Sequence, residues 1–414
     1  MKKKLLSILL CLVMVVGLLP TAAFAAGSVD INEANFPDAN FRSYVQTEFD
    51  KDGDKKLSSA EIAAVKEIIA STKGIKNLKG IEFFTALETL NCVDCELTAL
   101  DVSKNTELTS LNCGFNKLTE LDVSKNTKLE MLNCRGETLS YMKLTKLDVS
   151  QNKVLKELDC YSIKMKELNV SGCTALEELN CGGNQLTALD VSENTNLTIL
   201  RCASNQLTAL DVSKNLDLKG LYCRDNYLAV LDVSKNSKLE SISCGKNGLT
   251  SLDLDKNKKI DYIQLTEHQF YNKGTLPAGG TFDLNGLPGN FDPKRATNWV
   301  GGTVDAAGIL TVDADATEVT YNYQTKSGNV GANYLMSCKL NVKGGTTPLA
   351  KYAISVTGGI ANLAKAAEGS VVTLTADAPA ANMHFARWEV ESGSEAVTFA
   401  NATNSTTTFP MPAG

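Results

Sequence analysis

A cysteine that recurs at a fixed interval constrains the fold of this chain more than any other feature. Between Leu87 and Leu265 the repeated unit reads L-x-x-L-x-C-x-x-N-x-L-T-x-L-D-V-S-x-N-x-x. Self-similarity of this kind indicates a solenoid, in which every repeat forms one coil and neighbouring coils share a core. The period is 21 residues, with a single interval of 26, at Cys92, Cys113, Cys134, Cys160, Cys181, Cys202, Cys223 and Cys244.

The spacing of the leucines is typical of leucine-rich repeats. Each unit divides into two near-equal halves, L-x-x-L-x-C-x-x-N-x and L-x-x-L-x-V-x-x-N-x-x, so we expect two short strand-like flanks per coil and no full helix. Coils stacked about 4.8 Å apart would turn the Leu, Val and Cys columns into a continuous core. The sequence therefore predicts a mainly β fold, with a leucine-rich-repeat solenoid over residues 75–265.

The eight repeated cysteines are predicted to be a structural ladder of free thiols. Each replaces a leucine that points inward, where a free cysteine behaves as a small apolar side chain. Parallel stacking keeps the Cβ atoms of neighbouring coils about 4.8 Å apart, beyond the roughly 4.5 Å limit of a disulfide. Two further cysteines, Cys95 and Cys173, occupy Asn positions of the repeat, and Cys338 lies downstream.

The motif C-x-x-N-x-L-T-x-L-D-V-S-x-N-T-x-L resembles the cysteine-containing 21-residue repeats of internalin J-like surface proteins. That resemblance implies a binding protein on the surface of a Gram-positive bacterium, with stacked, unpaired thiols.

The first residues have the pattern of a secretory signal peptide over residues 1–25. Three lysines at positions 2–4 precede an apolar run to Leu19, and Ala23-Phe24-Ala25 resembles a cleavage site. The run is shorter than the roughly 20 residues that span a bilayer. We expect a secreted, cell-surface or cell-wall-associated protein without membrane insertion after cleavage.

Charge and histidine content argue against two functional classes. Removing three lysines with the signal peptide changes the net charge from −6 to −9, which disfavours nucleic acid as a partner. Only His268 and His384 are available for acid–base or zinc chemistry, and the aspartate repeated in the coils, with Asn169 as the exception, belongs to the turn motif D-V-S-x-N. We expect no enzyme and no catalytic residues in this chain.

Residues 28–74 are predicted to form a helical cap resembling an EF-hand, with helices over 41–49 and 59–69. An acidic loop between them offers oxygen ligands for Ca²⁺ from Asp50, Asp52, Asp54, Glu61 and the carbonyl of Lys56. Lys55 occupies the position at which such a loop usually has glycine. The alternative is an acidic helix pair that only seals the first coil; both can hold, and no cofactor is required.

Strand patterns with Gly, Pro and Asn turns follow the solenoid. Residues 266–343 predict an Ig-like β-sandwich, and residues 344–350 a linker. In residues 351–414, V-T-L-T-A, F-x-x-W and T-F-x-M-P resemble the divergent B-repeat modules of internalin-type proteins, with Trp388 as a core residue. The family's pattern continues into another strand, so we expect a truncated β module.

Two functional hypotheses remain open. The first is an adhesin-like monomer that presents a rigid repeat face to a host or bacterial surface protein or glycan. The alternative is the targeting or stalk region of a larger exported enzyme, whose catalytic domain lies beyond residue 414; a purely structural stalk is a third possibility.

Large side chains at outward positions of L-x-x-L-x-C mark a candidate binding site on the concave strand face. Most such positions hold Ser, Asn or Gly, whereas the departures are Ile199, Arg201, Tyr222 and Arg224, with a second group at Arg135 and Tyr161. Arg and Tyr are enriched at binding hot spots, although drift on a solvent face gives the same pattern. The insertion near 136–143 is expected to expose Leu139, Tyr141 and Met142.

Overall fold

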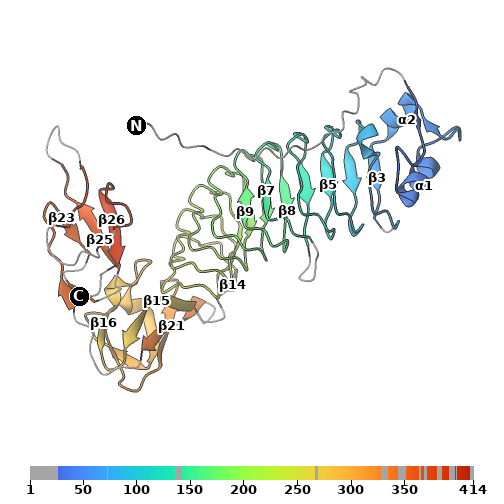
Figure 1. Cartoon of the computed structure of the whole chain (residues 1–414). Helices are drawn as coiled ribbons and strands as arrows, with labels where there is room; N and C mark the ends of the chain where they lie inside the picture. Colours follow the sequence, from blue (N-terminus) through green and yellow to red (C-terminus); the bar gives the residue numbers. More distant parts are fainter. Residues whose placement is uncertain are drawn as a thin grey trace, which may run out of the picture.

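The computed structural model is an elongated molecule, with a small helical unit at one end of a coil array and two strand modules at the other (Figure 1). It describes residues 27–71, 73–136, 142–265, 269–327, 334–343, 351–362, 365–367, 371–379, 385–390, 397 and 399–410. The predicted signal peptide and linker lie outside these residues. None of the helices described is long and apolar enough to cross a membrane.

One flank of the coils forms a ten-stranded parallel sheet. Neighbouring strands are in register, so that Leu179 pairs with Leu158 on one side and Leu200 on the other. Each coil thus repeats the same inward positions, as the predicted solenoid requires. The strands are β3 (Glu67–Ile69), β4 (Thr89–Asn91), β5 (Ser110–Asn112), β6 (Met131–Asn133), β8 (Glu157–Asp159), β10 (Glu178–Asn180), β11 (Ile199–Arg201), β12 (Gly220–Tyr222), β13 (Ser241–Ser243) and β14 (Tyr262–Gln264).

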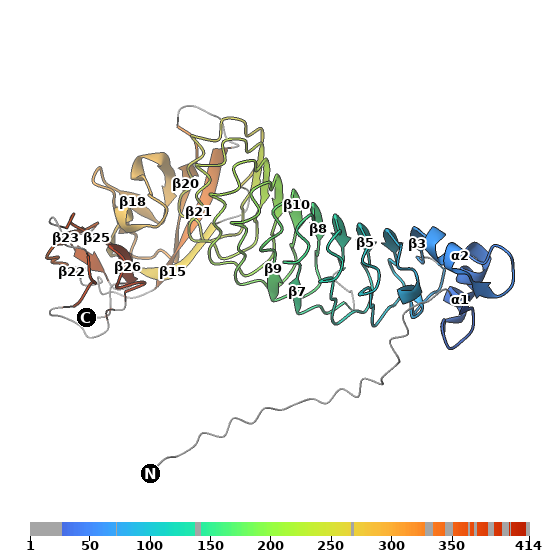
Figure 2. The ribbon, with the colours of Figure 1, turned by 90° about the horizontal axis from the view of Figure 1, so that it is seen from above.

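The prediction of a second strand flank is wrong for most coils. Among the described residues of the coils, only β7 (Lys146–Asp148) and β9 (Glu167–Asn169) pair there, on the side of the array opposite β8 and β10 (Figure 2). Elsewhere the motif D-V-S-x-N makes turns, as where the Asp211 carboxylate accepts a hydrogen bond from the Ser213 amide at 2.8 Å. The same turn bond follows β7, where the Ser150 amide donates to Asp148 at 2.9 Å, so this bond alone does not decide whether a strand forms.

The inward columns form the core that the sequence predicts. Nearly all leucines, valines and cysteines at the inward positions of the repeat are buried, and all eleven cysteines of the described chain are free and buried. Both columns of asparagines are also buried, and their side chains bond main-chain groups of the preceding coil or of their own coil. Asn205, for example, accepts a hydrogen bond from the Leu186 amide at 3.0 Å and donates to the carbonyls of Cys181 and Cys202.

The first coil is sealed by β1 (Val29–Asp30), α1 (Ala39–Glu48), β2 (Lys56–Leu57), α2 (Ser59–Ala64) and the 3-10 turn η1 (Ile81–Phe83). Phe36, Phe41 and Phe84 pack against one another over the end of the array. The helix predicted over 59–69 is wrong in its second half, because it ends at Ala64 and residues 67–69 become β3. Tyr44 accepts a hydrogen bond from the Ile69 amide, which ties α1 to this first strand.

The next module contains seven strands in two sheets, with orders β15-β21-β20-β17 and β16-β19-β18. Their bounds are β15 (Gln269–Pro277), β16 (Thr281–Asp283), β17 (Ala296–Val300), β18 (Gly302–Val304), β19 (Ile309–Val312), β20 (Glu318–Gln324) and β21 (Leu335–Lys343), with 3-10 turns η2 (Leu284–Gly286) and η3 (Pro293–Arg295). A strand-rich module is confirmed, and its Ig-like classification stays a prediction. Its core is continuous with that of the coils, and Tyr321 donates a hydrogen bond to the Thr250 carbonyl at 2.9 Å.

The last module has its own small core of Val372, Leu374, Trp388 and Phe409. Trp388 is buried, and its indole N–H donates to the Asn404 carbonyl at 3.0 Å, so it is a core residue as expected. The strands are β22 (Lys351–Ala353), β23 (Gly359–Ala361), β24 (Lys365–Ala367), β25 (Val371–Ala376) and β26 (Thr406–Pro410).

Candidate functional site

Ser, Asn and Gly are the commonest residues on the outward face of the ten-stranded sheet. Each coil contributes the first and third residues of its strand and the residue after the cysteine, such as Ser110, Asn112 and Gly114. Side chains alternate across a strand, so these three positions share one face while Leu111 and Cys113 point into the core. The large residues predicted from the sequence interrupt this face over neighbouring coils.

Arg135 and Tyr161 lie together, and a third residue, Phe115, which the sequence did not predict, lies beside them. The Arg135 guanidinium carbon lies 5.8 Å from the Tyr161 ring centroid and 5.6 Å from that of Phe115. A cation over an aromatic ring within about 6 Å is attracted by the ring quadrupole. The Tyr161 side chain remains 38% exposed, so this stack is available to a partner.

Tyr161 covers the glycines of the following coil. A Cβ atom built on Gly182 would lie 3.4 Å from its ring, and one built on Gly183 would lie 3.2 Å from it. A side chain at either position would therefore press against the ring. The two glycines leave the space in which Tyr161 lies.

Arg201 and Tyr222 form a second stack, three strands further along. The guanidinium carbon of Arg201 lies 5.6 Å from the Tyr222 ring centroid, and the Tyr222 hydroxyl hydrogen-bonds Ser241 Oγ at 2.9 Å. Gly220 again provides room, since a Cβ there would meet the ring at 3.0 Å. The strand of Ile199 precedes that of Tyr222, and Arg224 follows Tyr222 across the inward Cys223.

Two carboxylates hold the arginines of the stacks. Arg135 lies 3.7 Å from the Asp159 carboxylate, and Arg201 lies 3.3 Å from that of Glu178. Burial raises the pKa of Asp159 above its ordinary value, although the Tyr161 amide and the charges of Arg135 and Arg201 oppose the shift. The strands β6, β8, β10 and β11 that bring in these four charged residues are consecutive in the sheet, so the two predicted groups belong to a single surface.

We call this set the Arg–Tyr surface. The sequence reasoning missed four of its members, Phe115, Asp159, Glu178 and the 53% exposed Tyr262, although each stands in or beside the outward columns that identified the others. The surface comprises Phe115, Arg135, Asp159, Tyr161, Glu178, Ile199, Arg201, Tyr222, Arg224 and Tyr262.

The insertion beside Arg135 differs from its prediction at one residue. Met142, expected to be exposed, is fully buried in the core of the coils. An unbranched thioether side chain fills core space readily, which makes the inward position favourable. Leu139 and Tyr141 lie outside the described residues.

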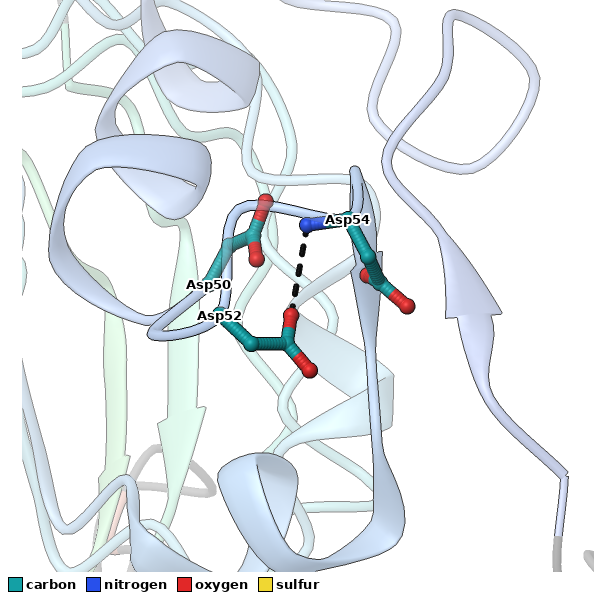
Figure 3. A group of neighbouring side chains, drawn as sticks. All are labelled: Asp50, Asp52 and Asp54. Carbon is teal, nitrogen blue, oxygen red and sulfur yellow. Dashed lines mark hydrogen bonds between the residues drawn. The ribbon is translucent and has the colours of Figure 1, made fainter.

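The acidic loop between α1 and α2 gathers three of the predicted calcium ligands (Figure 3). Asp50, Asp52 and Asp54 each offer a carboxylate oxygen within 4.8 Å of the others. The Asp50 carboxylate accepts hydrogen bonds from the Gly53 and Lys55 amides, and Lys55 adopts a left-handed φ of 64°. The loop thus makes the turn for which glycine is usual, at a conformational cost borne by a lysine.

Glu61 closes the loop from its other end. Its carboxylate accepts hydrogen bonds from the Ser58 amide at 2.8 Å and the Lys51 amide at 2.6 Å, and it completes a capping box with Ser58. The bonds from Ser58, and then that from Lys51, lower the pKa of Glu61. Lys56 lies in β2, opposite Asp30. This oxygen-rich set suits a hard cation, and calcium binding stays a prediction.

Comparisons with known proteins agree with the two resemblances expected from the sequence. Residues 352–414 match the family model of the divergent InlB B-repeat domain, which confirms the resemblance predicted for that segment. Three structural neighbours are internalins of Listeria monocytogenes, and no curated protein matches the chain.

The first neighbour is the functional domain of InlJ, described as including a cysteine ladder. It is 24% identical, with a TM-score of 0.44, over 77% of this chain and 99% of that domain. InlC2 is 23% identical, with a TM-score of 0.43, over 52% and 96%. InlF is 19% identical, with a TM-score of 0.38, over 62% and 87%. The solenoid fold itself rests on the strand register of this chain.

Proposed function

We propose that this chain is an exported, cell-surface binding protein, adhesin-like in role, whose coil array recognises a protein partner through the Arg–Tyr surface. The observation that carries the proposal is the gathering of stacked Arg and Tyr side chains on a face where Ser, Asn and Gly are the commonest residues. Such side chains supply most of the binding energy at protein interfaces.

The length of the surface favours a protein over a single sugar. From Phe115, beside β5, to Tyr262 in β14, the sheet advances by seven strands. At about 4.8 Å per strand this is about 34 Å. A standard protein interface buries about 800 Å² on each partner, which is a patch of roughly that width.

The internal ion pairs argue against a polyanionic partner. Arg135 and Arg201 are each held by a carboxylate of the same surface. Nucleic acids and strongly anionic glycans bind through uncompensated cations, whereas protein interfaces combine aromatic rings, arginines and paired charges. The signal-peptide pattern and the B-repeat match support export and a location at the cell surface.

A pull-down from host or bacterial surface extracts tests the proposal. Replacing Arg201, Tyr222 and Arg224 together by Ala should remove the captured protein, because the second stack is lost while the inward columns remain. The matched control replaces the exposed Lys214, Leu216 and Lys235, which lie next to the inward asparagines of the D-V-S-x-N turns. This control should capture as wild type does; unchanged capture by a folded Arg201/Tyr222/Arg224 variant would falsify the site.

A further inference from the structure

The charges of the Arg–Tyr surface follow a fixed order along the array. Arg135 reaches forward from the coil of β6 to Asp159 in β8, and Arg201 reaches back from β11 to Glu178 in β10. The strands β6, β8, β10 and β11 are consecutive in the sheet. The order is therefore positive, negative, negative, positive over four neighbouring coils.

Between the two arginines lie Glu157, beside the Arg–Tyr surface, and Asp159 and Glu178 within it; we call these three carboxylates the negative centre. Glu157 and Glu178 are partners in register on β8 and β10, and like charges directly opposite each other destabilise a pair of strands. Within the described chain, the exposed carboxylate of Glu157 has no hydrogen bond or ion pair. A partner with a cation at this point would relieve the repulsion, and anions on either side of that cation would meet Arg135 and Arg201.

The same order disfavours a second copy of this chain as the partner. Two copies related by a two-fold axis through the centre would place arginine opposite arginine and glutamate opposite glutamate. Like charges brought together across an interface cost several kcal/mol. The charge pattern of this surface is complemented by a partner with the opposite order of charges, namely negative, positive, negative.

We infer that the partner of this surface presents an extended segment with an acidic, a basic and an acidic side chain at alternate positions, here called an acid–base–acid segment. The inference rests on the proposed function and specifies its partner. The basic side chain lies against Glu157, Asp159 and Glu178, and the two acidic side chains lie against Arg135 and Arg201.

The spacing of an extended chain matches that of the coils. From β6 to β11 there are three steps in the sheet, or about 14 Å at about 4.8 Å per step. Residues i, i+2 and i+4 of a strand point to the same side and span about 13 Å at about 3.3 Å per residue. The central residue then lies about 7 Å from each end, level with the negative centre.

Selection from a phage library of random 12-residue peptides on the immobilised mature chain tests this inference. The enriched peptides should carry Asp or Glu at i and i+4 with Lys or Arg at i+2. A synthetic peptide with Asp-x-Lys-x-Asp should bind at least tenfold more tightly than its inverse with Lys-x-Asp-x-Lys. That preference should shrink in the double variant Glu157→Gln, Glu178→Gln, which removes two of the three central carboxylates and keeps the side chains at their size, while Arg135, Asp159 and Arg201 remain.

The outcomes separate the two claims. Enriched peptides without the acid–base–acid pattern, or no enriched peptides, overturn the inference about the partner. If peptides without the pattern still lose binding in the Arg201/Tyr222/Arg224 variant, the proposed recognition surface stands. If enriched peptides bind that variant as tightly as wild type, they bind elsewhere and the proposed surface fails as well.

Discussion

At the bends of the coils, the side chains of asparagines, and in one coil of Cys173, donate hydrogen bonds to main-chain carbonyls. Asn215 donates to the carbonyls of Val191 and Asn194, and its Oδ1 is buried with no partner among the described residues. Cys173 stands at the same position of another coil, and its thiol lies 3.1 Å from the Val149 carbonyl, to which it donates. A cysteine can therefore substitute for asparagine in this column, because only the donor is used.

The two asparagine columns should respond differently to substitution. We expect Asn205→Ala to lower the free energy of unfolding by about 2–4 kcal/mol, since three buried backbone groups lose their partner. Asn215→Cys should cost less than about 1 kcal/mol, because one donated bond remains and an unpaired acceptor is removed. Urea unfolding in reducing buffer measures both; equal losses would contradict the separate roles of the columns.

The thiol ladder makes the chain sensitive to alkali. Burial raises the pKa of Cys113 to about 12, and it raises that of Cys202 well above the ordinary value of 9.0. Above about pH 9 the thiols of the unfolded chain ionise while those of the folded chain cannot, so the unfolded state releases protons first and stability falls as pH rises.

Urea midpoints should therefore fall from pH 7 through pH 8.5 to pH 10, with the larger drop in the second interval. After denaturation under alkylation-protected, non-reducing conditions, the mature chain should titrate about eleven thiols. Four or more disulfides found by mass spectrometry would refute the ladder.

Cys202→Ser should lower the free energy of unfolding by about 1–3 kcal/mol, because it buries a hydroxyl without an assigned partner.

At the scale of elements, periodicity predicts what repeats and fails where a segment leaves the repeat. The coils, the inward cysteines and the strand flank follow from one 21-residue pattern. Residues 67–69 read as helix because their apolar spacing suits α2, yet pairing with β4 makes them the first strand. Local spacing alone does not contain that long-range pairing.

The candidate site was predictable only in part for a related reason. Register identifies the outward columns, so Arg201, Tyr222, Arg135 and Tyr161 could be found from the sequence. Whether a long side chain contacts the next coil, as Arg135 contacts Asp159, depends on its conformation in the folded chain, which the repeat pattern does not contain. The inward position of Met142 likewise depends on packing that the 26-residue interval does not reveal.

The acidic loop is the element with the clearest metal prediction. Calorimetric titration of the mature chain with Ca²⁺ should show one site, to which Asp50, Asp52, Asp54 and Glu61 contribute. Lys55→Gly should bind more tightly and stabilise the protein by about 1 kcal/mol, because it removes a positive charge and a left-handed non-glycine residue. Asp52→Asn is the control and should bind Ca²⁺ more weakly. A flat trace for both wild type and Lys55→Gly would contradict the predicted calcium site.

At the scale of the whole molecule, the coils that carry the Arg–Tyr surface share one continuous core with the seven-stranded module. The Asp255 carboxylate of the last coil accepts hydrogen bonds from the Ser327 amide and hydroxyl and lies near Arg295. Burial alone would raise the pKa of Asp255, but these bonds and that charge lower it. A targeting module of a larger exported enzyme would use the same surface in the same way.

The central claim, that a protein partner binds the strand face, is tested most directly by photo-crosslinking. Benzoylphenylalanine in place of Tyr161 or Tyr222 places the reactive group on the Arg–Tyr surface, and the same residue in place of Tyr227 is the control. Tyr227 is 59% exposed but lies in the bend after the inward Asn226. The account predicts that one partner protein crosslinks from Tyr161 and Tyr222 and not from Tyr227; crosslinking from Tyr227 alone would contradict it.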